Sequence, residues 1–154
     1  MATLGQNIAR KALSHVGEHE EPMGSNSGPE VDAYLAYVGL PPGQPWCAAF
    51  ACTMVYRTLV EMGIYTDYHP KTGSTHELLA WGQANGTVVS TPEPGDIGCM
   101  LFDATHGHTV ICVGIPPNDN VATVEGNHLD AVVNNVRRIA SCHWIRPYKV
   151  IPSA

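Results

Sequence analysis

Apolar residues in the first half of the chain recur at the spacing of amphipathic helices. Four such stretches, separated by turns rich in glycine, proline and polar residues, cover about residues 3–16, 29–38, 47–62 and 74–84. Two of them open on a capping-box signature, formed by Ser27 with Glu30 and by Ser74 with Glu77. The first half is therefore predicted to be helical.

The second half changes to the alternating pattern that is typical of β-strands. Residues 87–89 begin this region, and five strands separated by Gly, Pro, Asn or Asp turns are predicted at residues 97–102, 108–115, 120–125, 132–139 and 143–148. Helices followed by a run of strands indicate an α+β fold with an antiparallel sheet. Because the chain shows no repeat, linker or low-complexity segment, we expect residues 1–154 to form a single domain.

Composition excludes some classes of function. The 154 residues are 44% hydrophobic and 14% charged, which is typical of a globular protein. Acidic residues outnumber basic ones by 14 to 8, and no basic stripe is interleaved with aromatic residues, so nucleic-acid binding is not expected. The basic residues near the C-terminus resemble an ordinary solvated face: Arg137, Arg138, Arg146 and Lys149.

Neither a leader nor a membrane segment is expected. Residues 1–13 lack the apolar core of a signal peptide, and no run approaches the length of a membrane span. We therefore expect a soluble protein made in the cytoplasm. The five cysteines are an odd number at irregular spacings without a CxxC pair, which favours free thiols over a disulfide framework or a zinc site.

Cys47 is predicted to open the third helix, after a Pro45-Trp46 turn. The first turn of a helix offers unpaired N–H groups and the positive end of the macrodipole, and both favour a thiolate over a thiol. A cysteine in this place can act as a nucleophile if a base meets it. Otherwise it is a small buried apolar residue, as most free cysteines are.

His108 and the pair Glu125 and Asn127 supply candidates for that base and its partner. If the strands that carry them pair as a hairpin, Glu125 comes close to His108, and we expect both to face the helices. If the strand stays extended, Asn127 points to the same face as Glu125. An imidazole can accept the proton of a thiol, whose free pKa is about 8.5, when a carboxylate or amide fixes its tautomer. Such a set performs acyl transfer through a thioester.

Each part of the set also has a simpler interpretation. His108 can be structural or merely exposed, and Glu125-Gly126-Asn127 can be an ordinary turn. His106 and His108 can suggest a metal site, but the chain offers no obvious third ligand. The ordered combination of cysteine, histidine and Glu-x-Asn is what favours catalysis.

Four motifs carry a resemblance to a known family: Trp46-Cys47-Ala48-Ala49-Phe50, Pro94-Gly95-Asp96-Ile97, Gly107-His108-Thr109-Val110-Ile111 and Glu125-Gly126-Asn127. Together they resemble the CHAP domain of peptidoglycan hydrolases, a member of the papain-like superfamily. The similarity covers roughly residues 5–150. It implies a papain-like fold with N-terminal helices packed on a C-terminal antiparallel sheet.

The resemblance also implies roles for individual residues. Cys47 would be the nucleophile, His108 the general base and later the acid, Glu125 the residue that orients the imidazole, and Asn127 a supporting polar residue. Members of the family cleave amide bonds of peptidoglycan, either between muramic acid and L-alanine or within the stem peptide and its cross-bridge.

Trp46 and Gln44 are the candidates for substrate contact; Gln44 belongs either to the oxyanion hole or to an exposed turn. Some family members bind calcium through an acidic loop upstream of the cysteine. The corresponding region offers Glu20, Glu21, Asn26 and Asp32. Because it has no alternating Asp-x-Asp run, we expect no cofactor, with calcium as the alternative.

The leading hypothesis is a monomeric cysteine amidase or endopeptidase that acts on bacterial peptidoglycan. It would reach the cell wall as a phage lysin after release, or as an injected effector with delivery machinery and an immunity protein. One alternative is a non-catalytic phage structural or wall-binding module that retains the fold. Another is a papain-like protease or deamidase with a protein substrate.

Overall fold

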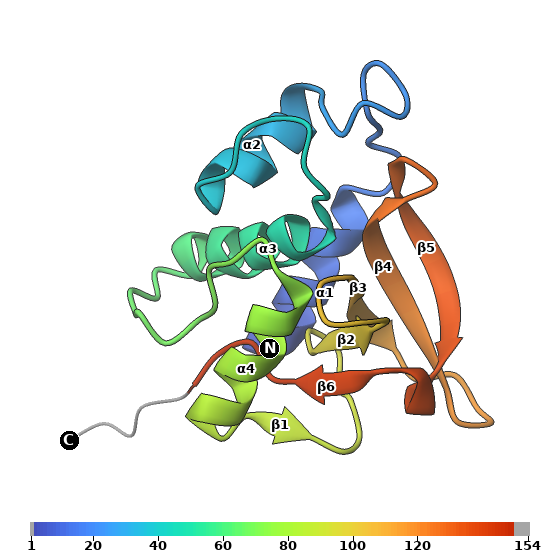
Figure 1. Ribbon diagram of the computed structural model, residues 1–154. Helices are drawn as coiled ribbons and strands as arrows, with labels where there is room; N and C mark the ends of the chain where they lie inside the picture. Colours follow the sequence, from blue (N-terminus) through green and yellow to red (C-terminus); the bar gives the residue numbers. More distant parts are fainter. Residues whose placement is uncertain (1, 150–154) are drawn as a thin grey trace.

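Helices lie on one side of a six-stranded antiparallel sheet in the computed structural model, which describes residues 2–149 (Figure 1). The helices are α1 (Leu4–Ser14), α2 (Pro29–Tyr37), α3 (Cys47–Glu61) and α4 (Thr75–Asn85). The strands are β1 (Val88–Val89), β2 (Ile97–Leu101), β3 (Gly107–Gly114), β4 (Asn120–His128), β5 (Ala131–Arg138) and β6 (His143–Ile145). A short 3-10 helix, Ile139–Ser141, joins β5 to β6. The predicted α+β fold is confirmed.

The strand order in the sheet is β1-β6-β2-β3-β4-β5. Three consecutive hairpins join β2 to β5, so neighbours in the sequence are neighbours in space across this part of the sheet. The last strand then returns to pair with both β1 and β2. β4 is interrupted by a bulge between Glu125 and His128, and a bulge redirects the side chains that follow it.

One of the two predicted capping boxes is wrong. At α4 half of the box is present: Ser74 is the N-cap and its side chain accepts a hydrogen bond from the backbone N–H of Glu77. The Glu77 side chain accepts from the Thr72 hydroxyl instead of from the Ser74 backbone. At α2 the N-cap is Gly28, whose φ of 138° suits glycine. The Ser27 hydroxyl instead donates to Asp32 at 2.8 Å, because the chain turns one residue later than predicted.

α3 forms the centre of the larger core. Eleven of its 15 residues are buried, since α1, α2, α4 and the sheet all pack against it. This explains why the helix is apolar nearly all round. β4 passes so close to α3 that a Cβ atom at Gly126 would lie 2.8 Å from the Cβ of Phe50. Glycine at this position therefore lets the end of β4 approach the first turn of α3.

Both faces of the sheet carry buried apolar side chains. Ile111 and Val124 belong to the larger core with the helices. The opposite face carries a smaller apolar cluster, formed by Met100, Val110, Cys112, Val121 and Trp144. β3 therefore buries side chains on both of its faces, which is why its sequence is almost continuously apolar.

All five cysteines are free thiols, as the sequence indicates. Burial raises the pKa of Cys52, Cys99 and Cys112 to about 12, so these residues remain neutral thiols at physiological pH. Within residues 2–149, none of the helices combines the length and the apolar character that crossing a membrane requires.

Candidate active site

Cys47 lies at the first residue of α3, and its side chain is almost fully buried. Burial by itself raises the pKa of a thiol. Here hydrogen bonds from His108, from the backbone N–H of Thr109 and from the Thr75 hydroxyl outweigh burial and lower the pKa of Cys47. Among the five cysteines, it is the one whose surroundings favour the thiolate.

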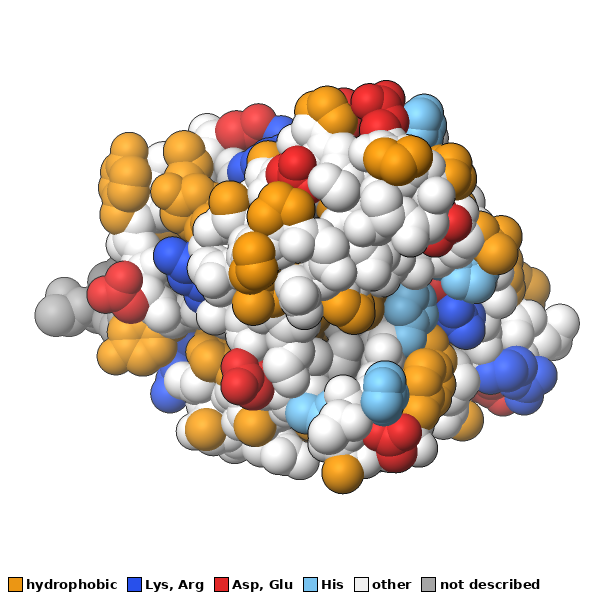
Figure 2. Space-filling model, turned by 45° about the horizontal axis from the view of Figure 1, so that its top comes forward, with side chains coloured by type: hydrophobic (Ala, Val, Ile, Leu, Met, Phe, Trp, Pro, Cys, Tyr) orange, Lys and Arg blue, Asp and Glu red, His pale blue; other side chains and the backbone are white. Residues whose placement is uncertain are grey.

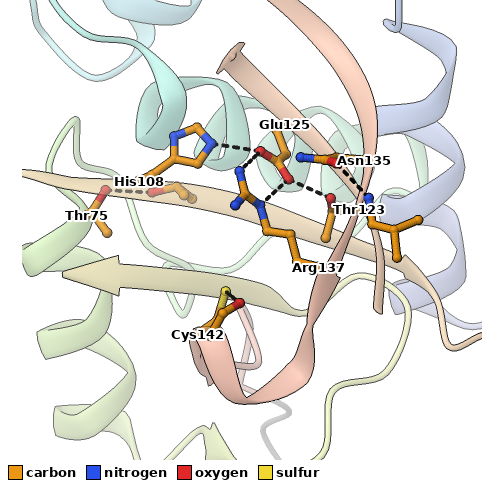
Figure 3. Close-up of polar contacts among 10 residues, drawn as sticks. Thr75, His108, Thr123, Glu125, Asn135, Arg137 and Cys142 are labelled. Atoms are coloured by element: carbon orange, nitrogen blue, oxygen red, sulfur yellow. Dashed lines mark hydrogen bonds and ion pairs between the residues drawn. The ribbon is translucent and has the colours of Figure 1, made fainter. Parts of the chain in front are cut away.

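His108 connects the thiol to a carboxylate. Its Nε2 atom lies 2.9 Å from Oε1 of Glu125, so the predicted contact between imidazole and carboxylate is present (Figure 3). Nε2 is thereby occupied, and Nδ1 is the nitrogen left for Cys47. Burial lowers the pKa of the imidazole, but the hydrogen bonds with Cys47 and Glu125 prevail and raise it to about 9. The shifts of both groups therefore favour a thiolate–imidazolium pair over a neutral thiol and imidazole.

Glu125 is fully buried and has a complete set of donors. Arg137 donates twice, from Nε to Oε2 and from Nη2 to Oε1, both at 2.6 Å (Figure 3). The Thr123 hydroxyl donates to Oε2 at 2.7 Å. Burial raises the pKa of Glu125, but Arg137, His108 and Thr123 outweigh it and hold the pKa well below its usual range. The carboxylate facing His108 is thus ionised and fixed.

The orientation of this pair corrects one expectation. Along β3, Ile111 packs against the helices, whereas His108 shares its face with Val110 in the smaller cluster. Glu125 likewise shares its face with Val121. The pair therefore faces away from the helical layer. The ladder between β3 and β4 runs from Ile111 to Gly114 on β3, short of His108, and the first turn of α3 meets His108 beyond its end.

Two residues of the site, Arg137 and Thr123, were not predicted from the sequence. Arg137 was expected on a solvated face, but it pairs with buried Glu125 because the register of β4 with β5 puts both on one face. Arg146 also departs from that expectation, since it donates to Asp96 at 3.1 Å. Thr123 could have been found by strand alternation alone, because it lies two residues before Glu125.

A hollow of about 200 Å³ lies beside Cys47, and Gln44, Ser74, Thr75, His76 and His106 contribute to its lining. Figure 2 shows histidine side chains gathered on one side of the face that it draws. Gln44 is therefore in a position to contact a substrate. The hollow carries imidazole, hydroxyl and amide groups beside Leu40 and Pro45, so it offers both polar and apolar contacts.

Trp46 does not line this hollow. It was expected to contact substrate, but its side chain is fully buried, stacks on Tyr34 and donates from Nε1 to Glu20 at 2.9 Å. Direct substrate contact is therefore wrong for this residue. Its indole instead anchors the chain immediately before Cys47.

Asn127 lies in the bulge of β4 with a φ of 58°, a left-handed conformation that asparagine tolerates better than most residues. The strand is not extended at this point. Simple alternation therefore does not place Asn127 on the face of Glu125, and its supporting role remains a prediction.

One group of side chains within residues 2–149 has the spacing of a metal site. His108, Glu125 and His128 each offer a ligand atom within 4.8 Å of the others. The Glu125 oxygens, however, already accept four hydrogen bonds, as many as a carboxylate can readily take. This arrangement suits a positioned histidine better than a metal ligand set.

The acidic residues considered for calcium accept hydrogen bonds from the chain itself. Glu20 accepts from the Trp46 indole and from the backbone N–H of Asn26, both at 2.9 Å. Asp32 accepts from the Ser27 hydroxyl. Calcium prefers six to eight oxygen ligands, so binding would require these oxygens to give up their present donors. The expectation of no cofactor stays a prediction.

Comparison with known proteins identifies the family. The family model for the CHAP domain matches residues 39–127, more than half of the chain, and this span includes Cys47, His108, Glu125 and Asn127. It is narrower than the resemblance over residues 5–150 noted above. Searches of curated proteins and of solved structures give no match. The chain therefore belongs to the CHAP family, a papain-like family of the peptidoglycan hydrolase and amidase type.

Proposed function

We propose that this protein is a cysteine hydrolase that cleaves amide bonds of bacterial peptidoglycan, as an amidase or an endopeptidase. One observation carries the proposal: a buried, ionised Glu125 holds His108, whose pKa is raised to about 9 beside a thiol of lowered pKa. This is the resting state that a cysteine nucleophile requires.

The reaction follows from the positions of these groups. The Cys47 thiolate attacks the carbonyl carbon, and the backbone N–H of Cys47, unpaired in the first turn of α3, donates to the oxyanion. His108 gives the Nδ1 proton to the leaving amine as the C–N bond breaks, and a thioester remains. His108 then takes a proton from water, which attacks the thioester, releases the carboxylic acid and restores the ion pair.

Two further residues are proposed to take part in the site because of where they lie. Gln44 lines the hollow beside Cys47 and is our candidate for an oxyanion donor or a contact to the peptide. Asn127 is our candidate for a supporting polar residue beside Glu125. We place the action of the protein at the cell wall, as a phage lysin or as an injected effector.

A non-catalytic module would give Cys47 the same surroundings as the other thiols. Burial raises the pKa of Cys52 to about 12, whereas donors around Cys47 lower its pKa despite similar burial. Retaining several donors around one thiol favours an enzyme over a module that keeps only the fold.

Purified protein incubated with peptidoglycan of several chemotypes should release soluble peptide fragments, and a Cys47→Ala variant should release none. Mass spectrometry identifies the new ends: free lactyl groups on muramic acid indicate an amidase, and cleaved stem peptides or cross-bridges an endopeptidase. Absence of fragments from every wall type would refute the peptidoglycan substrate. Equal release by both proteins would refute Cys47 as the nucleophile.

The rate of fragment release should follow a bell-shaped curve against pH. On the acid side it should rise as Cys47 loses its proton, at a pH below the ordinary thiol value of about 8.5. Above about pH 9 it should fall as His108 loses the proton that the leaving amine needs. A rate that continues to rise through pH 10 would contradict the ion pair.

A further inference from the structure

Two helices begin next to each other over β3. The starts of α3 and α4 lie near each other in Figure 1. α3 begins at Cys47 and α4 begins at Thr75, and both residues line the same hollow. The positive ends of two helix macrodipoles therefore lie close to one sulfur atom, where they favour negative charge. Thr75 is almost fully buried, so its hydroxyl requires a partner inside the protein.

That partner is Thr109, the residue after His108. The Oγ1 atoms of Thr75 and Thr109 are 2.8 Å apart, and both side chains are buried. Thr75 and Cys47 line the same hollow, and the Thr75 hydroxyl and the Thr109 backbone N–H both contribute to lowering the pKa of Cys47. Groups from two elements, α4 and β3, are thus in place to stabilise the thiolate.

When the Cys47 sulfur is ionised, the hydrogen bonds of the Thr75–Thr109 hydroxyl pair can run in one direction only. A hydroxyl has one hydrogen to donate, and a thiolate can only accept. If Thr75 donates to the sulfur, its oxygen must accept the hydrogen of Thr109. The result is a chain from Thr109 through Thr75 to Cys47, and hydrogen bonds to a charged acceptor are the stronger kind.

The backbone is shaped to allow this contact. Gly107 precedes His108 on β3, and a Cβ atom there would lie 3.1 Å from the Cβ of Thr75 and 2.5 Å from the carbonyl oxygen of Met100. Glycine therefore lets the first turn of α4 rest against β3. On the other side, the Ser74 N-cap fixes where α4 begins.

We propose that Thr75, oriented by Thr109, is a further residue of the active site that donates a hydrogen bond to the Cys47 thiolate and fixes it for attack. Its value for catalysis rests on the function proposed above. The contact itself does not, because it acts on the thiol in the absence of any substrate. Neither the sequence motifs nor the family match singles out this residue.

The test is the pH dependence of Cys47 alkylation by iodoacetamide, followed by mass spectrometry of the Cys47 peptide. Thr75→Val removes the hydroxyl at nearly constant volume and should raise the apparent thiol pKa by about one unit, since a hydrogen bond to a charged group has that strength. Below the wild-type pKa, alkylation should slow about tenfold. Thr75→Ser restores the hydroxyl and should restore the wild-type profile.

Thr58→Val is the matched control, because Thr58 is equally buried and its hydroxyl bonds only to the Met54 carbonyl of its own helix. It should leave the profile unchanged. Thr109→Val, which frees the Thr75 hydroxyl to rotate, should shift the profile in the same direction by a smaller amount, and it provides the test if Thr75→Val does not fold.

An unchanged profile in Thr75→Val, or in Thr109→Val where only that variant folds, would overturn the proposal. A shift equal to that of Thr58→Val would also overturn it, because the effect would then be one of general stability. A specific shift in a protein that releases nothing from any peptidoglycan would support the contact while refuting the proposed substrate.

Discussion

Cys47→Ser should reduce fragment release from peptidoglycan by at least about 10³-fold, because removing a nucleophile abolishes the covalent route. A serine hydroxyl has the same shape but stays protonated. Cys47 is also one of the two groups that raise the pKa of His108, so the serine variant lacks the ion pair as well as the sulfur nucleophile. The rate of fragment release and the thermal unfolding midpoint are the two measurements.

Cys142→Ser provides the matched control for this substitution. Cys142 is half-buried, and burial raises the pKa of its thiol, so it is expected to take no part in the reaction. The control should retain nearly full activity. If Cys47→Ser kept more than a small percentage of the wild-type rate while remaining folded, the preformed thiolate would not be the source of reactivity.

Arg137→Met should lower the free energy of unfolding by about 3–5 kcal/mol, as expected when one partner of a buried ion pair is removed. Glu125 is fully buried and receives two of its four hydrogen bonds from Arg137. Methionine keeps most of the side-chain volume but removes the arginine charge and two donors, so the buried carboxylate keeps His108 as its remaining cationic partner. Denaturant-induced unfolding at neutral pH is the measurement.

Arg138→Met is the control, since Arg138 is the next residue on β5 and is exposed. It should change the free energy of unfolding by no more than about 0.5 kcal/mol. Adding Glu125→Gln to Arg137→Met should recover part of the loss, because a buried carboxylate that has lost its arginine donors is replaced by a neutral amide. Equal destabilisation by the two arginine variants would show that the buried pair contributes nothing specific.

The fold class and one contact of the site could be predicted because they depend on local spacing. Strand alternation and short turns determine the hairpins, and counting across one of them brings Glu125 to His108. His108 and Glu125 were predicted on the face of the sheet that packs against the helices, and this prediction is wrong for a physical reason. β3 is buried on both faces, so its apolar pattern does not show which face meets the helices.

The remaining parts of the site depend on contacts that sequence spacing does not encode. The buried Trp46 indole donates to Glu20, which lies 26 positions earlier in an irregular loop. Arg137 resembles a solvated charge until the register of β5 is known. Thr75 reaches Cys47 only because two helices begin side by side over β3.

The strand order has a consequence for how the protein is synthesised. β6 fills the space between β1 and β2 although it comes last in the chain, so one edge of β2 stays unpaired until residues 143–145 have left the ribosome. The partners of Cys47 also emerge late, since Glu125 and Arg137 belong to the final third of the chain. The nascent helix that carries Cys47 is therefore complete long before the charges that activate it, and the nucleophile is assembled only after residues 125–137 have been synthesised.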